Sequence, residues 1–332
     1  MRRPIAVTSL CIAAAALSPH SGRRSALSRK VSTPKTAQQK LSAPKSPRHT
    51  LSAAALEEEL KTNEPYWHDN RIHSFGNVGF GGVFASVLGP LATWAIDQAA
   101  YEGRNVRAEA CAMAAVDQKS RATATCSAAY DVHAVVDLGC GIGASTRCLR
   151  AAFPGASVTA VDTSVHFLNV ARALTNPMQR PVDFRLVNAE ETGLEAASQD
   201  VAVISFVLHE APAAGRKALL KEARRVLKPG GTLMVLDIAQ TYEPSDAMAA
   251  GEPYVYGYMK NIRRDLDAAG FAGVEEAHLV EDRATLWLCA KDARVPPRNN
   301  ILSLGSFTPI VPAKNNVLSL AEFSPVEAAV RP

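Results

Sequence analysis

Two features are scarce in this sequence: closely spaced cysteines and, near the start of the chain, acidic side chains. The six cysteines show no C-x-x-C spacing, so neither a paired zinc site nor a redox dithiol is predicted, and we expect no metal site. The first acidic residue is Glu57; ten of the 36 Lys and Arg precede it, which leaves 26 basic against 32 acidic residues. Because a net negative body repels a phosphate backbone, nucleic acid is not an expected partner.

Long apolar runs are lacking as well. The apolar stretch 5–17 follows Arg2 and Arg3 and is shorter than the roughly 20 residues that a bilayer span needs, so we expect no transmembrane segment. A tract rich in Ser, Thr, Pro, Arg and Lys continues to about Thr50. A signal-like start before a transit-like tract resembles the bipartite leader of algae with complex plastids. Residues 1–50 are therefore predicted to be a targeting presequence for the plastid (chloroplast), with a mitochondrial presequence or a secretory signal as alternatives.

Residues 51–130 are predicted to form an N-terminal helical segment that contributes to the cover of the active site. A helix is expected over Leu51–Leu60, which is rich in Ala, Leu and Glu. The glycines at 76, 79, 81 and 82 are expected to break the chain. One or two helices should follow over Val83–Tyr101, where Pro90 interrupts an apolar run.

From Val135 onward, short apolar runs alternate with helical stretches, which predicts an α/β fold: a Rossmann-like, mostly parallel, seven-stranded sheet with helices on both faces. A helix is expected at about Tyr256–Ala269, and the last two strands should close the sheet as a hairpin. The expected strands are Ala134–Leu138, Ser157–Asp162, Val182–Asn188, Val201–Val207, Thr232–Ile238, Val274–His278 and Ala284–Lys291.

The end of the chain contains a duplicated motif. Asn299–Leu304 returns as Asn315–Leu320, and Phe307–Pro309 returns as Phe323–Pro325. Two copies are too few for a solenoid, which needs about three repeats to bury a core. We therefore interpret residues 293–332 as a flexible tail with a duplicated short motif.

A glycine-rich turn follows the first predicted strand of the sheet. Gly139, Gly141 and Gly143 allow the backbone to turn tightly and approach a ligand, and the helix that begins after them offers free N–H groups. With Ala144 the turn also satisfies the dinucleotide pattern G-x-G-x-x-G/A. Asp162 ends the next strand, where an acid accepts hydrogen bonds from ribose hydroxyls. These residues alone fit either a nicotinamide dinucleotide or another adenosine cofactor.

Asp137 distinguishes between the two kinds of cofactor. A carboxylate two residues before the first glycine would repel a pyrophosphate but favours a cationic amino-acid group. S-adenosylmethionine (SAM) carries an ammonium and a sulfonium and has no phosphate. Asp137 therefore favours SAM over a dinucleotide.

Four motifs in order resemble class I SAM-dependent methyltransferases of the small-molecule type. Val135–Gly143 resembles their first motif, Val161-Asp162 the acid after their second strand, Asn188–Glu190 the adenine-contacting segment, and Leu227–Leu233 the turn into their fifth strand. The resemblance implies that residues 131–292 are a SAM-binding methyltransferase domain with SAM as cofactor. The cofactor-binding residues implied are Asp137, Gly139, Cys140, Gly141, Gly143, Asp162, Thr163, Ala189 and Glu190.

The methyl acceptor is expected to be a small molecule that binds beyond the carboxyl end of the fourth strand, where open α/β sheets place their ligands. His209 is the candidate general base there, with Glu210 beside it, because the ordinary pKa of histidine lies near neutral pH. The alternatives are that His209 caps the strand or contacts the cofactor, and that Glu210 is a helix-start charge. Aromatic and histidine side chains of two segments, 65–73 and 251–256, are expected to cover the acceptor: Tyr66, Trp67, His68, His73, Tyr254 and Tyr256.

Two other functions remain open from the sequence. The spacing of Gly139, Gly141 and Ala144 also suits an NAD(P)-dependent oxidoreductase, and a SAM-binding protein without turnover has the same motifs. The acceptor atom, whether O, N, S or C, and the oligomeric state are not defined by these residues.

Overall fold

The computed structural model describes residues 65–69, 71–72, 77, 79–124, 132–175 and 181–291, with only the backbone of 121–124. Those from Tyr66 onward belong to one compact unit. The predicted presequence, the expected helix Leu51–Leu60, His73 and the tail from residue 293 lie outside the described residues.

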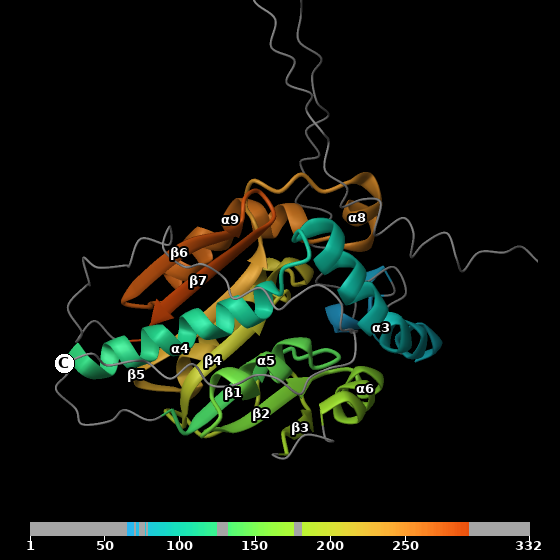
Figure 1. Cartoon of the computed structure of the whole chain (residues 1–332). Helices are drawn as coiled ribbons and strands as arrows, with labels where there is room; N and C mark the ends of the chain where they lie inside the picture. The colour runs from blue at the N-terminus through green and yellow to red at the C-terminus, as the bar shows by residue number, and fades with distance from the viewer. Residues whose placement is uncertain are drawn as a thin grey trace, which may run out of the picture. The chain divides into compact units, whose positions relative to one another are not determined.

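A seven-stranded sheet forms the centre of the fold, with the strand order β3-β2-β1-β4-β5-β7-β6. The first five strands are parallel, and β7 runs antiparallel to both β5 and β6. This arrangement confirms the predicted Rossmann-like class (Figure 1). The strands are β1 (Ala134–Leu138), β2 (Ser157–Asp162), β3 (Asp183–Leu186), β4 (Gln199–Ser205), β5 (Leu227–Ile238), β6 (Gly273–Val280) and β7 (Ala284–Ala290).

Helices cover both faces of the sheet because the side chains of its central strands alternate between two apolar clusters. In β5, Met234 and Leu236 pack into one cluster, and Leu233 and Val235 into the other. The first cluster includes α4 (Val106–Ala124), α5 (Ala144–Ala152) and α6 (Val165–Thr175); the second includes α7 (Ala213–Val226) and α9 (Val255–Ala268). Each large aliphatic side chain buried in this way contributes about 1.5–3 kcal/mol.

Helix α3 (Gly79–Ala100) is one continuous helix, so the predicted breaks at Gly81 and Gly82 and the interruption at Pro90 are wrong. Gly79 begins the helix, and Gly76 lies outside the described residues. Two glycines of α3 serve close packing instead: a Cβ at Gly82 would lie 2.5 Å from the Asn77 carbonyl oxygen, and one at Gly89 would lie 3.1 Å from Ile142. Asp97 of α3 pairs with Arg107 of α4 at 2.9 Å. By length and composition alone, α3 could cross a bilayer, a feature that the sequence prediction did not register.

Several predicted strand boundaries shift, two of them where the backbone leaves regular structure. Strand β4 ends at Ser205 rather than Val207, because Phe206 has a φ of 57° and cannot continue an extended strand. Strand β5 begins at Leu227 rather than Thr232, directly after α7 ends at Val226, and Gly230 adopts a φ of 81° within this irregular start. The expected helix at 256–269 is present as α9, and the closing hairpin is β6–β7.

Candidate functional site

The glycine turn after β1 adopts a backbone that only glycine takes easily. Gly139, Gly141 and Gly143 have φ values of 79°, 51° and 77°. A Cβ at Gly139 would lie 2.7 Å from the Val207 side chain, whereas one at Gly141 would meet nothing within 4 Å. The two glycines therefore have different roles. Gly139 permits close packing against the segment after β4, whereas Gly141 leaves backbone atoms uncovered by a side chain.

Asp162, at the end of β2, holds this turn in place. One of its carboxylate oxygens accepts a hydrogen bond from the Gly141 N–H at 2.8 Å, and the other accepts from the Ser164 N–H at 2.8 Å. The side chain also lines the cavity described below. A single carboxylate thus fixes the loop and presents negative charge to a ligand.

Asp137 lies beneath the turn, fully buried. Its Oδ2 accepts hydrogen bonds from the Ser145 and Thr146 hydroxyls at 2.8 and 2.6 Å, which ties β1 to the first turn of α5. Its Oδ1 has no hydrogen-bond partner among the described residues. Burial raises the pKa of Asp137 to about 6, so a carboxylate charge is kept here at neutral pH against a desolvation cost.

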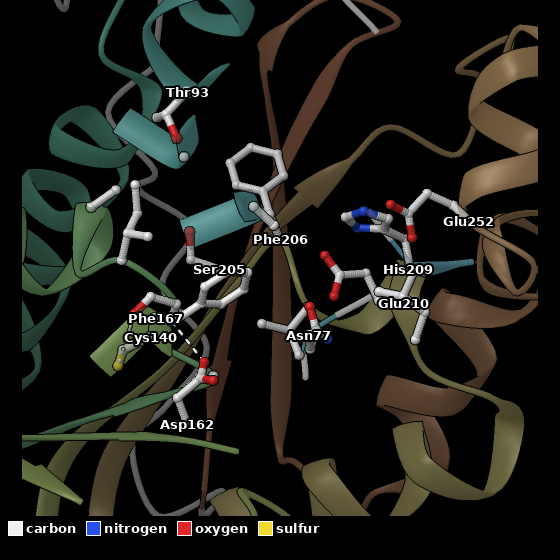
Figure 2. A pocket seen from close by; sticks show the side chains of 18 of the residues that line it. Asn77, Thr93, Cys140, Asp162, Phe167, Ser205, Phe206, His209, Glu210 and Glu252 are labelled. Atoms are coloured by element: carbon white, nitrogen blue, oxygen red, sulfur yellow. Dashed lines mark hydrogen bonds between the residues drawn. The ribbon is translucent and has the colours of Figure 1, made fainter. Parts of the chain in front are cut away.

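A cavity of about 640 Å³ extends from the glycine turn to the segment after β4. Figure 2 shows Cys140 and Asp162 at one end of this cavity, and His209, Glu210 and Glu252 at the other. Helix α3 contributes apolar lining through Leu88, Ala92 and Ile96 and a hydroxyl through Thr93. The cavity therefore combines polar groups at its two ends with a largely apolar contribution from α3.

Phe206 stands between the two ends and carries backbone strain. Its positive φ is uncommon for a bulky residue and costs on the order of 1–3 kcal/mol. The ring stacks on Tyr101 with centroids 5.8 Å apart, and the Arg107 guanidinium lies 4.8 Å from its centroid. These contacts hold the strained residue and place its ring against the cavity.

His209, in the short helix η3 (Leu208–Glu210), is bonded to a buried carboxylate at the end of β5. Its Nδ1 lies 2.6 Å from the Oδ1 of Asp237, which is itself fully buried. The other Asp237 oxygen accepts from the Leu208 and His209 backbone N–H groups at 3.0 and 3.3 Å. Asp237 therefore fixes both the ring and the backbone of the segment that follows β4.

The charge state of His209 differs from the one that the sequence suggested. Burial opposes the charged ring, but the Asp237 carboxylate, with smaller contributions from Glu210 and Glu252, raises the pKa of His209 to about 9. A general base must be neutral before it acts, so at neutral pH the ring is in the opposite state and donates hydrogen bonds.

Some of the residues that were expected to cover the acceptor line the cavity. Tyr66 and Trp67 of η1 (Tyr66–His68) line the cavity. The Tyr66 hydroxyl donates to Glu190 at 2.7 Å, and its ring meets Tyr254 edge-on at 6.3 Å. Burial and the Glu190 carboxylate raise the pKa of Tyr66, so the hydroxyl stays protonated.

Of the predicted site residues that the structure describes, ten lie together on the cavity wall and six do not. On the wall are Gly139, Cys140, Gly141, Asp162, Thr163, Ala189, His209, Glu210, Tyr66 and Trp67. Away from it are Asp137 beneath the turn, Gly143 packed on Ala171 of α6, Glu190 behind Tyr66, and His68 and Tyr256 on the exposed surface. Tyr254 supports Tyr66 from behind.

Several residues that line the cavity or hold its lining in place were not predicted from the sequence. Asp237 had a usable signal, since it is a lone acid at the end of an apolar strand, as Asp137 and Asp162 are. Tyr101, Arg107 and the α3 residues had none, because their part in the site depends on how α3 packs against α6 and how α4 packs against α5 and β5.

Comparison with known proteins identifies a conserved domain type in this region. Residues 136–235 match the family described as "Methyltransferase domain". The ubiquinone/menaquinone biosynthesis C-methyltransferase UbiE of Syntrophotalea carbinolica is 32% identical over 117 residues, covering 35% of this chain and 47% of that protein. A carboxy-S-adenosyl-L-methionine synthase of Aeromonas hydrophila is 34% identical over 101 residues, covering 30% and 41%. The match thus spans less than half the length of these relatives.

Among solved structures, the phosphoethanolamine N-methyltransferase 2 of Haemonchus contortus in complex with S-adenosyl-L-methionine has 17% identity and a TM-score of 0.42, with 49% of each chain covered. The CurJ carbon methyltransferase has 16% identity and a TM-score of 0.41, with 49% and 50% covered.

Proposed function

This chain contains a class I SAM-dependent methyltransferase domain, and we propose that it transfers the methyl group of SAM to a small-molecule acceptor bound between α3 and His209. The observation that carries this proposal is the single cavity that joins the glycine turn and Asp162 at one end to the polar cluster of His209 at the other.

The cofactor end of the cavity suits SAM. The bare backbone of Gly139–Gly141 forms one wall, the Asp162 carboxylate stands where ribose hydroxyls bind in such sheets, and Ala189 follows β3 on the same wall. When bound, SAM supplies a methyl group on a sulfonium, which the acceptor displaces in line. The buried Asp137 charge beneath the turn favours the cationic end of this cofactor over a pyrophosphate.

The acceptor end suits a small molecule with an apolar body and a polar reacting atom. Leu88, Ala92 and Ile96 of α3 form the apolar wall, and Trp67 covers the same space. The protonated His209, held by Asp237, donates a hydrogen bond to an acceptor atom or orients it toward the methyl group. The enclosed shape also excludes water from the reacting atoms.

Calorimetric titration with SAM and, separately, with NADH tests the cofactor. We expect SAM to bind and the Asp162→Ala variant to weaken binding by at least tenfold, because it loses both the ribose acceptor and the bond to the turn. Asp183→Ala, which removes an exposed carboxylate from neighbouring β3, is the matched control and should bind normally. Tight NADH binding with no response to SAM would instead establish the oxidoreductase alternative.

Incubation of the protein with isotope-labelled SAM and a plastid metabolite extract, followed by mass spectrometry, tests the acceptor. We expect labelled methyl on one small molecule and none without protein. If SAM binds but no metabolite takes up label, the chain is a binding protein without turnover.

We also propose that residues 1–50 direct the protein to the plastid. The support is their basic, acid-free composition with an apolar start. A fluorescent protein fused after residue 50 and expressed in an alga with a complex plastid should be imported. Accumulation in mitochondria or secretion would favour one of the two alternatives.

A further inference from the structure

The polar end of the cavity brings three potential metal ligands together. His209, Glu210 and Glu252 each offer one ligand atom, and these atoms all lie within 4.8 Å of one another. His209 and Glu252 are buried and Glu210 is partly so. Figure 2 shows the two glutamates flanking the imidazole ring on the cavity side. The residues come from η3 after β4 and from the end of α8 (Asp246–Gly251).

The imidazole is oriented as a metal ligand would be. Its Nδ1 is engaged by Asp237 at 2.6 Å, so Nε2 is the nitrogen left for a ligand in the cavity. His209 is only 7% exposed, and Nε2 has no hydrogen-bond partner among the residues that the structure describes. A histidine whose other nitrogen bonds a carboxylate is the usual arrangement behind metal-bound imidazoles.

Carboxylates surround the imidazole at this end of the cavity. Asp237, Glu210 and Glu252 each act on the ring electrostatically, and Glu210 and Glu252 belong to the same set of potential ligands. One imidazole with carboxylates is a donor set that divalent transition metals accept.

From this geometry we propose that His209, Glu210 and Glu252 form a binding site for a divalent transition-metal ion at the acceptor end of the cavity. Ligand atoms bonded to one ion at about 2.0–2.2 Å lie at most about 4.4 Å apart, so atoms that lie within 4.8 Å of one another reach a common ion after a small side-chain adjustment. One imidazole with two carboxylates suits Mn²⁺, Fe²⁺ or Zn²⁺ better than Mg²⁺, which prefers oxygen alone. An ion bound here would replace the Nε2 proton of His209, and its remaining coordination positions would take an oxygen atom of the acceptor in place of the hydrogen bond from the protonated ring.

Mn²⁺ binding to the full-length protein, without SAM, tests this site independently of methyl transfer. Electron paramagnetic resonance counts free Mn²⁺ at about pH 8, since binding must displace a proton from His209. We expect one bound ion per chain. Glu252→Gln should weaken binding by at least tenfold, and Asp237→Asn by about 10–100-fold through loss of ring orientation.

Two controls keep the result specific to this cluster. Glu243→Gln removes an exposed carboxylate in the segment that follows β5. This variant should bind Mn²⁺ as the wild type does. Circular dichroism of each variant establishes that it is folded. The proposal is overturned if the folded wild type binds no Mn²⁺ or Zn²⁺, or if Glu252→Gln binds as tightly as Glu243→Gln. It is equally overturned if the cluster binds only an organic ammonium acceptor.

Discussion

Replacing Asp137 with asparagine should stabilise the protein at alkaline pH while weakening SAM binding. The ordinary pKa of this carboxyl is 3.8, and burial raises it to about 6 in the folded protein. The folded state therefore binds the proton more tightly than the unfolded chain does. Stability from this group is present below about pH 4 and is lost as the pH rises through about 6.

The size of the effect follows from the shift. A difference of about two pKa units corresponds to about 3 kcal/mol of unfolding free energy at pH 8. An asparagine carries no charge at any of these pH values, and its side-chain oxygen still accepts from Ser145 and Thr146. The stability difference between Asp137→Asn and the wild type should therefore grow by about 1.4 kcal/mol in favour of the variant between pH 5 and pH 8.

Urea unfolding at pH 5 and pH 8, followed by circular dichroism, measures this difference. Because only its change with pH is compared, a constant packing effect of the substitution cancels. Asp183→Asn, at an exposed position of β3, controls for the removal of one carboxylate. A stability difference that stays constant between the two pH values would refute the buried-charge argument.

The Asp137→Asn variant also tests whether the buried carboxylate charge contributes to SAM binding. If Asp137 favours the cationic end of SAM, the asparagine variant should bind SAM at least tenfold more weakly at pH 8, a loss of about 1.4 kcal/mol. Unchanged affinity would show that Asp137 serves only to hold the start of α5.

Two further predictions concern the supports of the site. Arg216 and Asp265 form an ion pair at 3.0 Å with each side chain 1% exposed. Asp265→Ala should therefore lower the free energy of unfolding in urea by about 3–5 kcal/mol, and the double replacement Arg216→Met, Asp265→Leu should recover most of that loss. A loss under 1 kcal/mol in Asp265→Ala would contradict the expectation that the substitution leaves a buried charge unpaired. Gly139→Ala combines a positive φ with a 2.7 Å clash against Val207, whereas Gly141→Ala meets open space. Thermal unfolding should therefore show a loss of about 1–2 kcal/mol for Gly141→Ala and more for Gly139→Ala; equal losses would mean that the Val207 contact relaxes freely.

The sequence alone determined the features that depend on local patterns. The bounds of β1 and β2 follow from short apolar runs, and the positive φ values of Gly139, Gly141 and Gly143 follow from the glycine spacing. The strand-end acids Asp137 and Asp162 are visible because a charged residue inside an apolar strand needs a partner or a ligand. These patterns involve residues close in the chain, where backbone geometry decides the outcome.

Only the tertiary structure decided which distant residues meet. Tyr66 and Glu190 are 124 positions apart, and His209 and Asp237 are 28 apart; no periodicity relates them. The adjacency of β4 and β5 in the parallel sheet places Asp237 beside η3, and that contact sets the charge of His209. The packing of α3 likewise decided that Gly82 is a contact point rather than a break. Secondary-structure propensity and motif spacing depend on residues that are close in the chain, whereas burial and charge depend on residues that are close in space. The arrangement at the acceptor end of the cavity could therefore be derived only from the fold.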